Sequence, residues 1–301
     1  MKAGDFLEYI LENEMLSLRF STLGAELLSA RRGDFEYIWQ GAPGLWREHA
    51  PLLFPICSHL TGDIYTYRGK TYAMGAHGFA RKKEFTLADR GAHYLSFLLR
   101  DDETTRAVYP FPFCLRVTYT LTGDCLTERA VIENPGTEFL PAAFGGHPGF
   151  SLPFPGNRFE DCYLDFGEGA APREVVLSIP DCFDTGKREP YALREGRYLP
   201  LTRDLFAVDG HFLADTTGSV TLRARHGKHF VRMDYADFSY LGFWQNAAGE
   251  PGFLCLEPWY GLPTRVGVTD DLALKNDLLH IRPGDSAALS FSVVFGEEKE
   301  K

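Results

Sequence analysis

The chain has 301 residues, 45% of them hydrophobic, and 31 Lys and Arg against 41 Asp and Glu give a formal net charge of −10. This composition is typical of a folded globular protein, and an acidic chain lacks the basic field that phosphate-backbone binding requires, so we expect no nucleic acid partner. No segment approaches the roughly 18 consecutive apolar residues that span a bilayer, and the N-terminal segment is acidic where a signal peptide is apolar. These features predict a cytoplasmic protein with no membrane partner.

Short segments that alternate apolar and polar residues recur along the chain, separated by Gly, Pro, Asn and Asp. They are rich in β-branched and aromatic residues, which is typical of strands. The clearest predicted strands span residues 15–20, 93–100, 115–123, 219–225, 229–235, 253–258 and 287–296. Helical periodicity is nearly absent, because 30 Gly and 18 Pro interrupt the chain. We expect at most a turn or two of helix, near residues 43–51 or 202–206.

The predicted strands extend from the first twenty residues to the last ten, with no Ser/Gly-rich linker or charge block between them. This distribution favours an all-β protein in which residues 1–301 form a single domain, a large antiparallel two-layer β-sandwich.

The first candidate functional loop is AMGAHGFARKKEF, residues 73–85. Gly78 follows His77 and lets the backbone approach a ligand closely, and the guanidinium of Arg81 suits an acidic partner or sugar hydroxyls. The alternative is that His77 packs in a turn and Arg81 pairs with an acid.

Two later loops carry the strongest candidates for acid/base chemistry. In AAFGGHPGFSLPF (142–154), glycines and a proline surround His147, the side-chain type that exchanges protons near neutral pH. In GFLCLEPWYGLP (252–263), Glu257 ends an apolar strand and is followed by Pro258 and Trp259, so we expect its carboxyl at the rim of an aromatic-lined pocket. Desolvation there would raise the pKa of the carboxyl toward that of a general base. The alternatives are that His147 has only a structural role in a tight turn and that Glu257 belongs to a buried salt bridge.

Other motifs are weak or missing. His226 and His229 have metal-ligand spacing but no third ligand nearby, so a hairpin turn is the better interpretation and we expect no metal site. The six cysteines form no CxxC pair, which argues against a zinc ribbon or a disulfide framework. Dinucleotide, nucleoside-triphosphate and serine-hydrolase motifs are missing. The 14 Tyr, 24 Phe and 4 Trp are compatible with a carbohydrate-binding platform.

The order of motifs resembles that of the aldose 1-epimerase (galactose mutarotase-like) family, and within it the LacX-like branch. The resemblance covers about residues 10–296 and rests on the following segments: PLLFPICSHL, HGFAR, YPFPFCLRVTYTL, FGGHPGF, LFAVDGHFL and FLCLEPWYGLP. It implies a single large antiparallel β-supersandwich, in agreement with the strand pattern.

The resemblance also implies a mechanism and the roles of particular residues. Glu257 would be the general base that takes the proton of the anomeric hydroxyl, and His147 the general acid that protonates the ring oxygen. No metal or organic cofactor would be needed. His77 and Asp209 would hold the sugar, although Asp204 or Asp215 could replace Asp209.

The sequence departs from the family pattern at two places. Many relatives have Gly-Arg after the PLLFP segment, with the arginine reaching the sugar, whereas this chain has Ser58 and His59. The contact is therefore altered at His59 or supplied by Arg81. Relatives of the branch often carry Asp where this chain has Thr264.

The leading hypothesis is an aldose 1-epimerase that interconverts the α and β anomers of a hexose or related aldose, as a monomer or homodimer. One alternative is a hexose-phosphate mutarotase in which Arg81, Lys82 and Lys83, read as a strand, hold the phosphate. Another is a non-catalytic carbohydrate-binding or regulatory protein.

Overall fold

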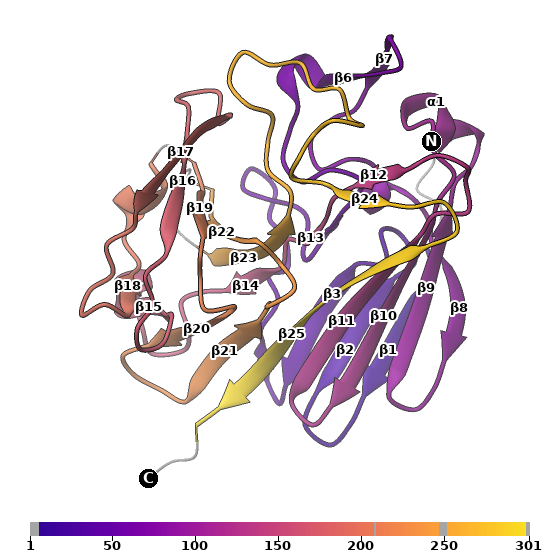
Figure 1. Ribbon diagram of the computed structural model, residues 1–301. Helices are drawn as coiled ribbons and strands as arrows, with labels where there is room; N and C mark the ends of the chain where they lie inside the picture. The colour runs from indigo at the N-terminus through magenta and orange to yellow at the C-terminus, as the bar shows by residue number, and fades with distance from the viewer. Residues whose placement is uncertain (1–5, 208, 247–251, 299–301) are drawn as a thin grey trace.

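The computed structural model describes residues 6–207, 209–246 and 252–298, and its architecture is almost entirely antiparallel β (Figure 1). The all-β, antiparallel sandwich predicted from the strand pattern is confirmed. Within the described residues, no helix is long and apolar enough to cross a membrane. All six cysteines are free thiols.

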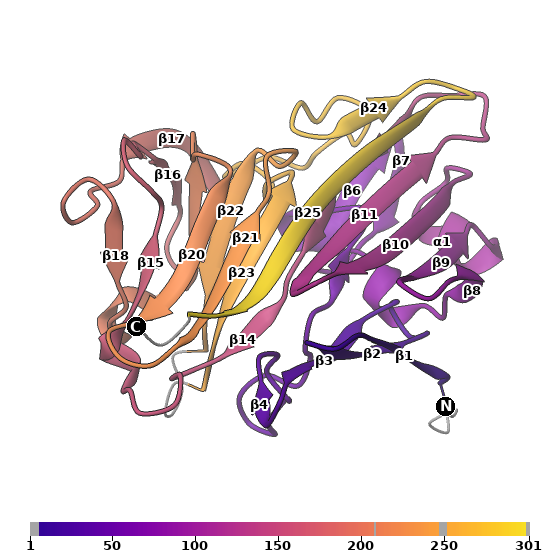
Figure 2. The same ribbon diagram turned by 90° about the horizontal axis from the view of Figure 1, so that it is seen from below.

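The largest sheet extends across the whole molecule. Its strands are β8 (Thr86–Arg90), β9 (Tyr94–Arg100), β10 (Cys114–Thr122), β11 (Cys125–Glu133), β15 (Cys162–Asp165), β18 (Tyr198–Pro200), β20 (Ser219–Ala224), β21 (His229–Asp234) and β25 (Ser286–Glu297). The order is β18-β15-β20-β21-β25-β11-β10-β9-β8. Figure 2 shows β25 crossing the middle, where it joins β11 of the earlier chain to β21 of the later chain. Because buried and partly exposed residues alternate along most of β25, one face of this sheet packs on the core.

A second sheet carries the candidate functional loops. Its strands are β5 (Leu52–Leu53), β13 (Phe144–Gly146), β14 (Gly149–Ser151), β16 (Arg173–Leu177), β17 (Asp184–Pro190), β19 (His211–Ala214), β22 (Tyr240–Trp244) and β23 (Phe253–Tyr260). The order is β17-β16-β19-β22-β23-β13-β5, and β14 also pairs with β23. Nearly every residue of β23 is buried, because this strand is central and covered on both faces.

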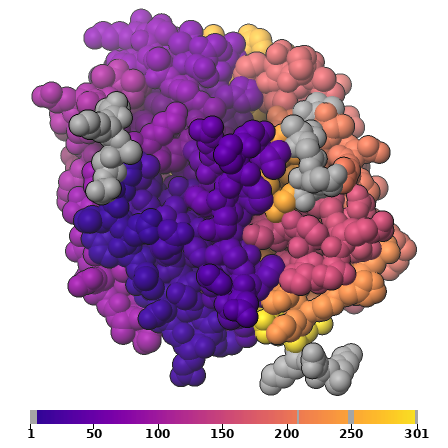
Figure 3. Space-filling model, turned by 180° about the vertical axis from the view of Figure 1, so that it is seen from behind, coloured from indigo at the N-terminus to yellow at the C-terminus, as the bar shows by residue number. Residues whose placement is uncertain are grey.

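A third sheet covers the early part of the largest sheet. It contains β1 (Glu8–Glu12), β2 (Ser17–Ser21), β3 (Leu27–Arg32) and β4 (Phe35–Glu36). Phe20 of β2 packs on Tyr119 of β10 and on Phe97 of β9, with ring centroids 4.6 and 6.4 Å apart. Seen from behind, the indigo and purple early chain meets the pink to orange later chain side by side (Figure 3).

The remaining elements are short. They are the strand pairs β6 (Ile64–Tyr67) with β7 (Lys70–Ala73) and β12 (Leu140–Ala142) with β24 (Leu279–Ile281), helix α1 (Glu103–Val108), and the 3-10 turns η1 (Thr61–Asp63), η2 (Ala80–Lys82), η3 (Phe159–Asp161) and η4 (Arg203–Phe206). The helical turn expected near residues 202–206 is confirmed as η4, whereas the one near 43–51 is wrong, because bends and turns occupy that segment. Helix α1 was not predicted, although Asp102 caps it by accepting from the Thr105 N–H at 2.7 Å.

Candidate active site

The register of the second sheet places His147 opposite Glu257. Strand β13 pairs with β23 through Gly145 and Trp259, and β14 pairs with the same strand through Gly149 and Cys255. Both pairings keep one antiparallel register, so the residue midway between Gly145 and Gly149 faces the residue midway between Cys255 and Trp259. The imidazole Nε2 of His147 lies 3.2 Å from the Oε2 of Glu257.

The sequence around His147 explains the gap between β13 and β14. Pro148 has no N–H to donate to a ladder, so pairing is interrupted there. The His147 N–H instead donates to the Pro51 carbonyl at 3.1 Å. A Cβ on Gly146 would lie 2.8 Å from the Phe291 ring, so the glycine allows β13 to approach β25.

Both residues line a cavity of about 250 Å³. The other lining residues are Trp46, Glu48, Ser58, His59, His77, Arg81, Leu177, Cys182, Asp209, Phe212, Trp244 and Trp259. The rings of Trp46 and Trp244 stand 5.2 and 5.9 Å from that of His147. The cavity is smaller than the roughly 300–1,000 Å³ of drug-sized ligand pockets, so it suits a monosaccharide-sized ligand.

His77 stands beside this pair, held by a tight turn. Its backbone is left-handed (φ 63°), and Gly78 after it leaves room for the Phe54 carbonyl, which a Cβ would approach to 2.3 Å. The Ser58 N–H donates to Nδ1 of His77 at 3.1 Å, so the neutral ring carries its proton on Nε2. The His77 ring centroid lies 5.4 Å from that of His147.

Arg81 lines the cavity but is engaged by an acid. Its Nη1 donates to both carboxylate oxygens of Glu48, at 3.0 and 2.7 Å. The interpretation of residues 81–83 as a strand is wrong, since Arg81 and Lys82 lie in η2. Lys83 pairs with Asp102 at 3.4 Å, and only Arg81 of the three lines the cavity.

The remaining predicted sugar-binding residues also lie in the cavity wall. His59 is fixed by Ser58 Oγ at Nδ1 (3.1 Å) and by the Asp181 carbonyl at Nε2 (2.9 Å). Asp209 lines this cavity and an adjoining one of about 340 Å³.

Asp204 and Asp215, the alternatives to Asp209, and Thr264, where the sequence departs from the family pattern, all lie outside this cavity. Asp204 lines only the adjoining cavity, and Asp215 lines neither. Thr264 is fully buried outside the cavity and donates to Asp270 at 2.7 Å.

Burial shifts the pKa values of the central groups. It raises the pKa of Glu257 well above its usual value, and the charge of Asp209 adds to this shift. It lowers the pKa of His147 to about 3, and it lowers that of His77 well below the usual value. Desolvation thus favours the uncharged forms of both partners in the His147–Glu257 pair, and a single shared proton resides on the carboxyl.

One cluster among the described residues has the side chains to hold a metal ion. It consists of His147, Cys255 and Glu257, whose ligand atoms lie within 4.8 Å of one another. A metal there would occupy both members of the acid/base pair, so metal binding and proton transfer would compete for the same atoms.

Sequence reasoning missed several lining residues. Trp46 and Glu48 belong to the segment GLWREHAP, in which a tryptophan and an acid within a proline-flanked loop were the only available signal. Trp259 was read as part of an aromatic rim, but its indole Nε1 is buried and has no hydrogen-bond partner in the described part of the chain. It is therefore an unpaired buried donor of a residue in the cavity wall.

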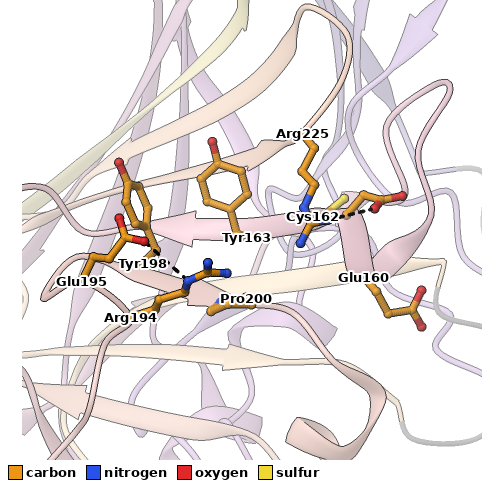
Figure 4. A pocket seen from close by; sticks show the side chains of 9 residues that line it. Glu160, Cys162, Tyr163, Arg194, Glu195, Tyr198, Pro200 and Arg225 are labelled. Atoms are coloured by element: carbon orange, nitrogen blue, oxygen red, sulfur yellow. Dashed lines mark ion pairs between the residues drawn. The ribbon is translucent and has the colours of Figure 1, made fainter.

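A second hollow, of about 220 Å³, lies on β15 and β18 (Figure 4). Its described lining contains the ion pairs Arg194–Glu195 at 3.6 Å and Arg225–Asp161 at 4.0 Å, and no imidazole. It offers no pair of groups suited to acid/base catalysis.

The fold and the site define a class of protein, and sequence comparison agrees. A family model for aldose 1-epimerases matches residues 8–269. The chain therefore belongs to the aldose 1-epimerase family, as the motif order indicated.

The similarity extends to particular members. The chain is 35% identical over 294 residues to protein LacX of Lactococcus lactis subsp. lactis, in its chromosomal and plasmid forms, covering 94% of this chain and 97% of LacX. A solved galactose mutarotase related enzyme from Lactobacillus acidophilus has 34% identity and a TM-score of 0.91, covering 96% and 97% of the two chains. A galactose mutarotase-like protein from Lactobacillus casei has 30% identity and a TM-score of 0.88, covering 96% and 99%.

Proposed function

We propose that the protein interconverts the α and β anomers of a hexose or closely related aldose by acid/base opening of the sugar ring. The observation that carries this proposal is the buried pair of Glu257 and His147, 3.2 Å apart at the wall of a monosaccharide-sized cavity. Ring opening needs one group to take a proton and another to give one, and this pair supplies both.

Ring opening requires the removal of one proton from the sugar and the addition of one proton to it. The Glu257 carboxylate takes the proton of the anomeric hydroxyl, the C1 to ring-oxygen bond breaks, and His147 gives its Nε2 proton to the ring oxygen. The product is the open-chain aldehyde. Rotation about C1–C2 and closure with the roles reversed yield the other anomer, so no cofactor is consumed.

The electrostatics of the pair support this direction of proton transfer. In the free site both groups are neutral and the shared proton lies on the Glu257 carboxyl. Ring opening starts from the ionic form, which arises when that proton moves to Nε2 of His147, and it ends with both groups neutral again. Burial raises the pKa of Glu257 and lowers that of His147, so the site stabilises the neutral pair relative to the ionic one. Once the ionic pair has formed, the environment therefore favours transfer of the proton from the imidazole to the carboxyl through the sugar.

The neighbouring residues fit the binding of sugar hydroxyls. His77 offers an Nε2–H donor, Asp209 offers carboxylate acceptors, and His59 and Arg81 contribute polar atoms to the same wall. The indole faces of Trp46 and Trp244 suit stacking against the apolar face of a pyranose.

Neither alternative function is favoured by the site. A phosphate would have to compete with Glu48 for Arg81, and Asp209 places further negative charge in the wall. A protein that only bound sugar would have no use for a buried acid and base in contact.

The test is polarimetry of freshly dissolved α-anomers over a panel of aldoses. We expect the wild type to accelerate mutarotation of at least one hexose and Glu257→Gln to lose about a hundredfold or more in kcat, the usual contribution of a general base. Glu160→Gln, in the hollow of Figure 4, is the matched control and should keep full activity. No acceleration by the wild type, or full activity in Glu257→Gln, would reject the proposal.

A further inference from the structure

Glu128 is a buried carboxyl that the proposed reaction does not use. It lies on β11 opposite Phe291 of β25, in the space between the sheets. Among the described residues it has no ion-pair partner, and its Oε1 has no hydrogen-bond partner. An unpaired carboxylate is costly to bury, and burial raises the pKa of Glu128 to about 8. The group is therefore protonated at neutral pH.

Tyr119 of β10 lies directly opposite Glu128 in the sheet, and its hydroxyl donates to the Ala25 carbonyl at 2.8 Å. Because the phenol proton is used on Ala25, the phenol oxygen accepts the carboxyl proton. Oε1 of Glu128 is then the carbonyl oxygen of a neutral acid and can only accept.

His147 presents a matching atom on the side of its ring away from Nε2. Its Nδ1 is buried and has no hydrogen-bond partner on another described residue; the ring's one backbone contact is with His147 itself. His147 and Glu128 both line one cavity of about 20 Å³ between the sheets, whose other side chains, such as Ile38, Leu126 and Val293, are apolar. A cavity of this size holds about one water molecule, and such a water requires at least two polar partners.

We propose that Glu128 is a positioning residue that keeps a proton on Nδ1 of His147 through one buried water. Nδ1–H donates to the water, and the water donates to Oε1 of Glu128. The Glu128 hydroxyl donates to Tyr119, which donates to the Ala25 carbonyl. Each link of this chain pairs one donor with one acceptor, and no proton is transferred along it.

The inference rests on the proposed function, because it concerns the form of His147 that ring opening needs. When His147 gives its Nε2 proton to the sugar, it remains a neutral imidazole only if Nδ1 keeps its own proton. The Nδ1–H tautomer first takes the Glu257 proton on Nε2 and returns to the same neutral form after giving it to the sugar. The Nε2–H tautomer would have to become an imidazolate, which is far less favourable. An acceptor held at Nδ1 selects the productive tautomer and fixes the ring plane.

The experiment compares Glu128→Met, Glu128→Gln and Val293→Ala with the wild type. Methionine removes the acceptor, glutamine retains a carbonyl oxygen and a donor for Tyr119, and Val293→Ala alters the same cavity without removing a polar atom. We measure kcat and KM by polarimetry and the His147 tautomer by nitrogen-15 NMR of histidine-labelled protein. The His147 signal is assigned by its loss in His147→Gln.

We expect kcat to fall about tenfold in Glu128→Met with little change in KM, the rate equivalent of one hydrogen bond of ordinary strength. The NMR signal should move toward the Nε2–H tautomer. Glu128→Gln and Val293→Ala should keep kcat within about twofold and the Nδ1–H form.

Wild-type kcat and tautomer in Glu128→Met would overturn the inference. If Glu128→Met does not fold, the wild-type spectrum still decides, because a neutral Nε2–H His147 in the free protein contradicts the proposal. Should the wild type show no mutarotation, the proposed function fails on its own, while the NMR comparison continues to test the water-mediated link between Glu128 and His147.

Discussion

Replacing Glu128 with glutamine removes one titrating carboxyl from between the sheets. The free energy of unfolding of the variant, relative to that of the wild type, should therefore increase as the pH rises. In the folded protein burial raises the pKa of Glu128 to about 8, whereas the ordinary value is 4.5. Between these two values the folded chain holds a proton that the unfolded chain has lost. The free energy of unfolding of the wild type therefore falls with increasing pH across this window, by at most about 1.4 kcal/mol per pH unit.

From pH 4.5 to pH 7 this loss amounts to about 3 kcal/mol. Glutamine does not titrate, so the stability of Glu128→Gln relative to the wild type should rise by that amount over the same interval. Denaturant unfolding of both proteins at a series of pH values measures the difference, and contributions from other titrating groups cancel in it. A difference that stays constant between about pH 5 and pH 7 would show that Glu128 does not titrate as its burial requires.

Three further results are expected. Burial lowers the pKa of His147 to about 3 and raises that of Glu257, so kcat/KM should not change as the pH falls through 6.5. A loss of kcat/KM centred at pH 6.5 would contradict the conclusion that the pair shares one proton. Gly78→Ala should lower the free energy of unfolding by about 2 kcal/mol or more, since a backbone carbonyl stands 2.3 Å from the new Cβ; a loss under about 0.5 kcal/mol in denaturant unfolding would refute this. Glu48→Gln should free Arg81 from its ion pair and raise the ratio of kcat/KM for glucose 6-phosphate to kcat/KM for glucose, and added salt should reduce this increase. An unchanged ratio would show that Glu48 does not mask Arg81.

The strand content was predictable because alternation of apolar and polar residues is a local signal. Residues 115–123, for example, read as a strand, and the structure forms β10 there. The short helix α1 was missed because six residues cannot establish a helical period. The capping residues Asp102 and Thr105 do not predict a helix unless a helical period follows them.

The loops around His77, His147 and Glu257 were identifiable because glycine and proline surround residues able to exchange or donate protons. Burial was harder to infer. Glu257 was expected at the rim of a pocket, but its side chain is only 2% exposed because β23 is covered on both faces. The role of Glu48 as the partner of Arg81 has no sequence signature, since 33 residues separate them.

The sequence by itself determined the strands, the family and the identity of the polar residues in the loops, because each depends on local order along the chain. Only the tertiary structure decided which of these residues meet. His147 and Glu257 come together because β13 and β14 share one register on β23, and Glu128 lies near His147 because β11 and β25 pack behind the glycines of β13. The pKa values that suit these groups to proton transfer arise from desolvation, which no segment possesses until the sheets have closed around it.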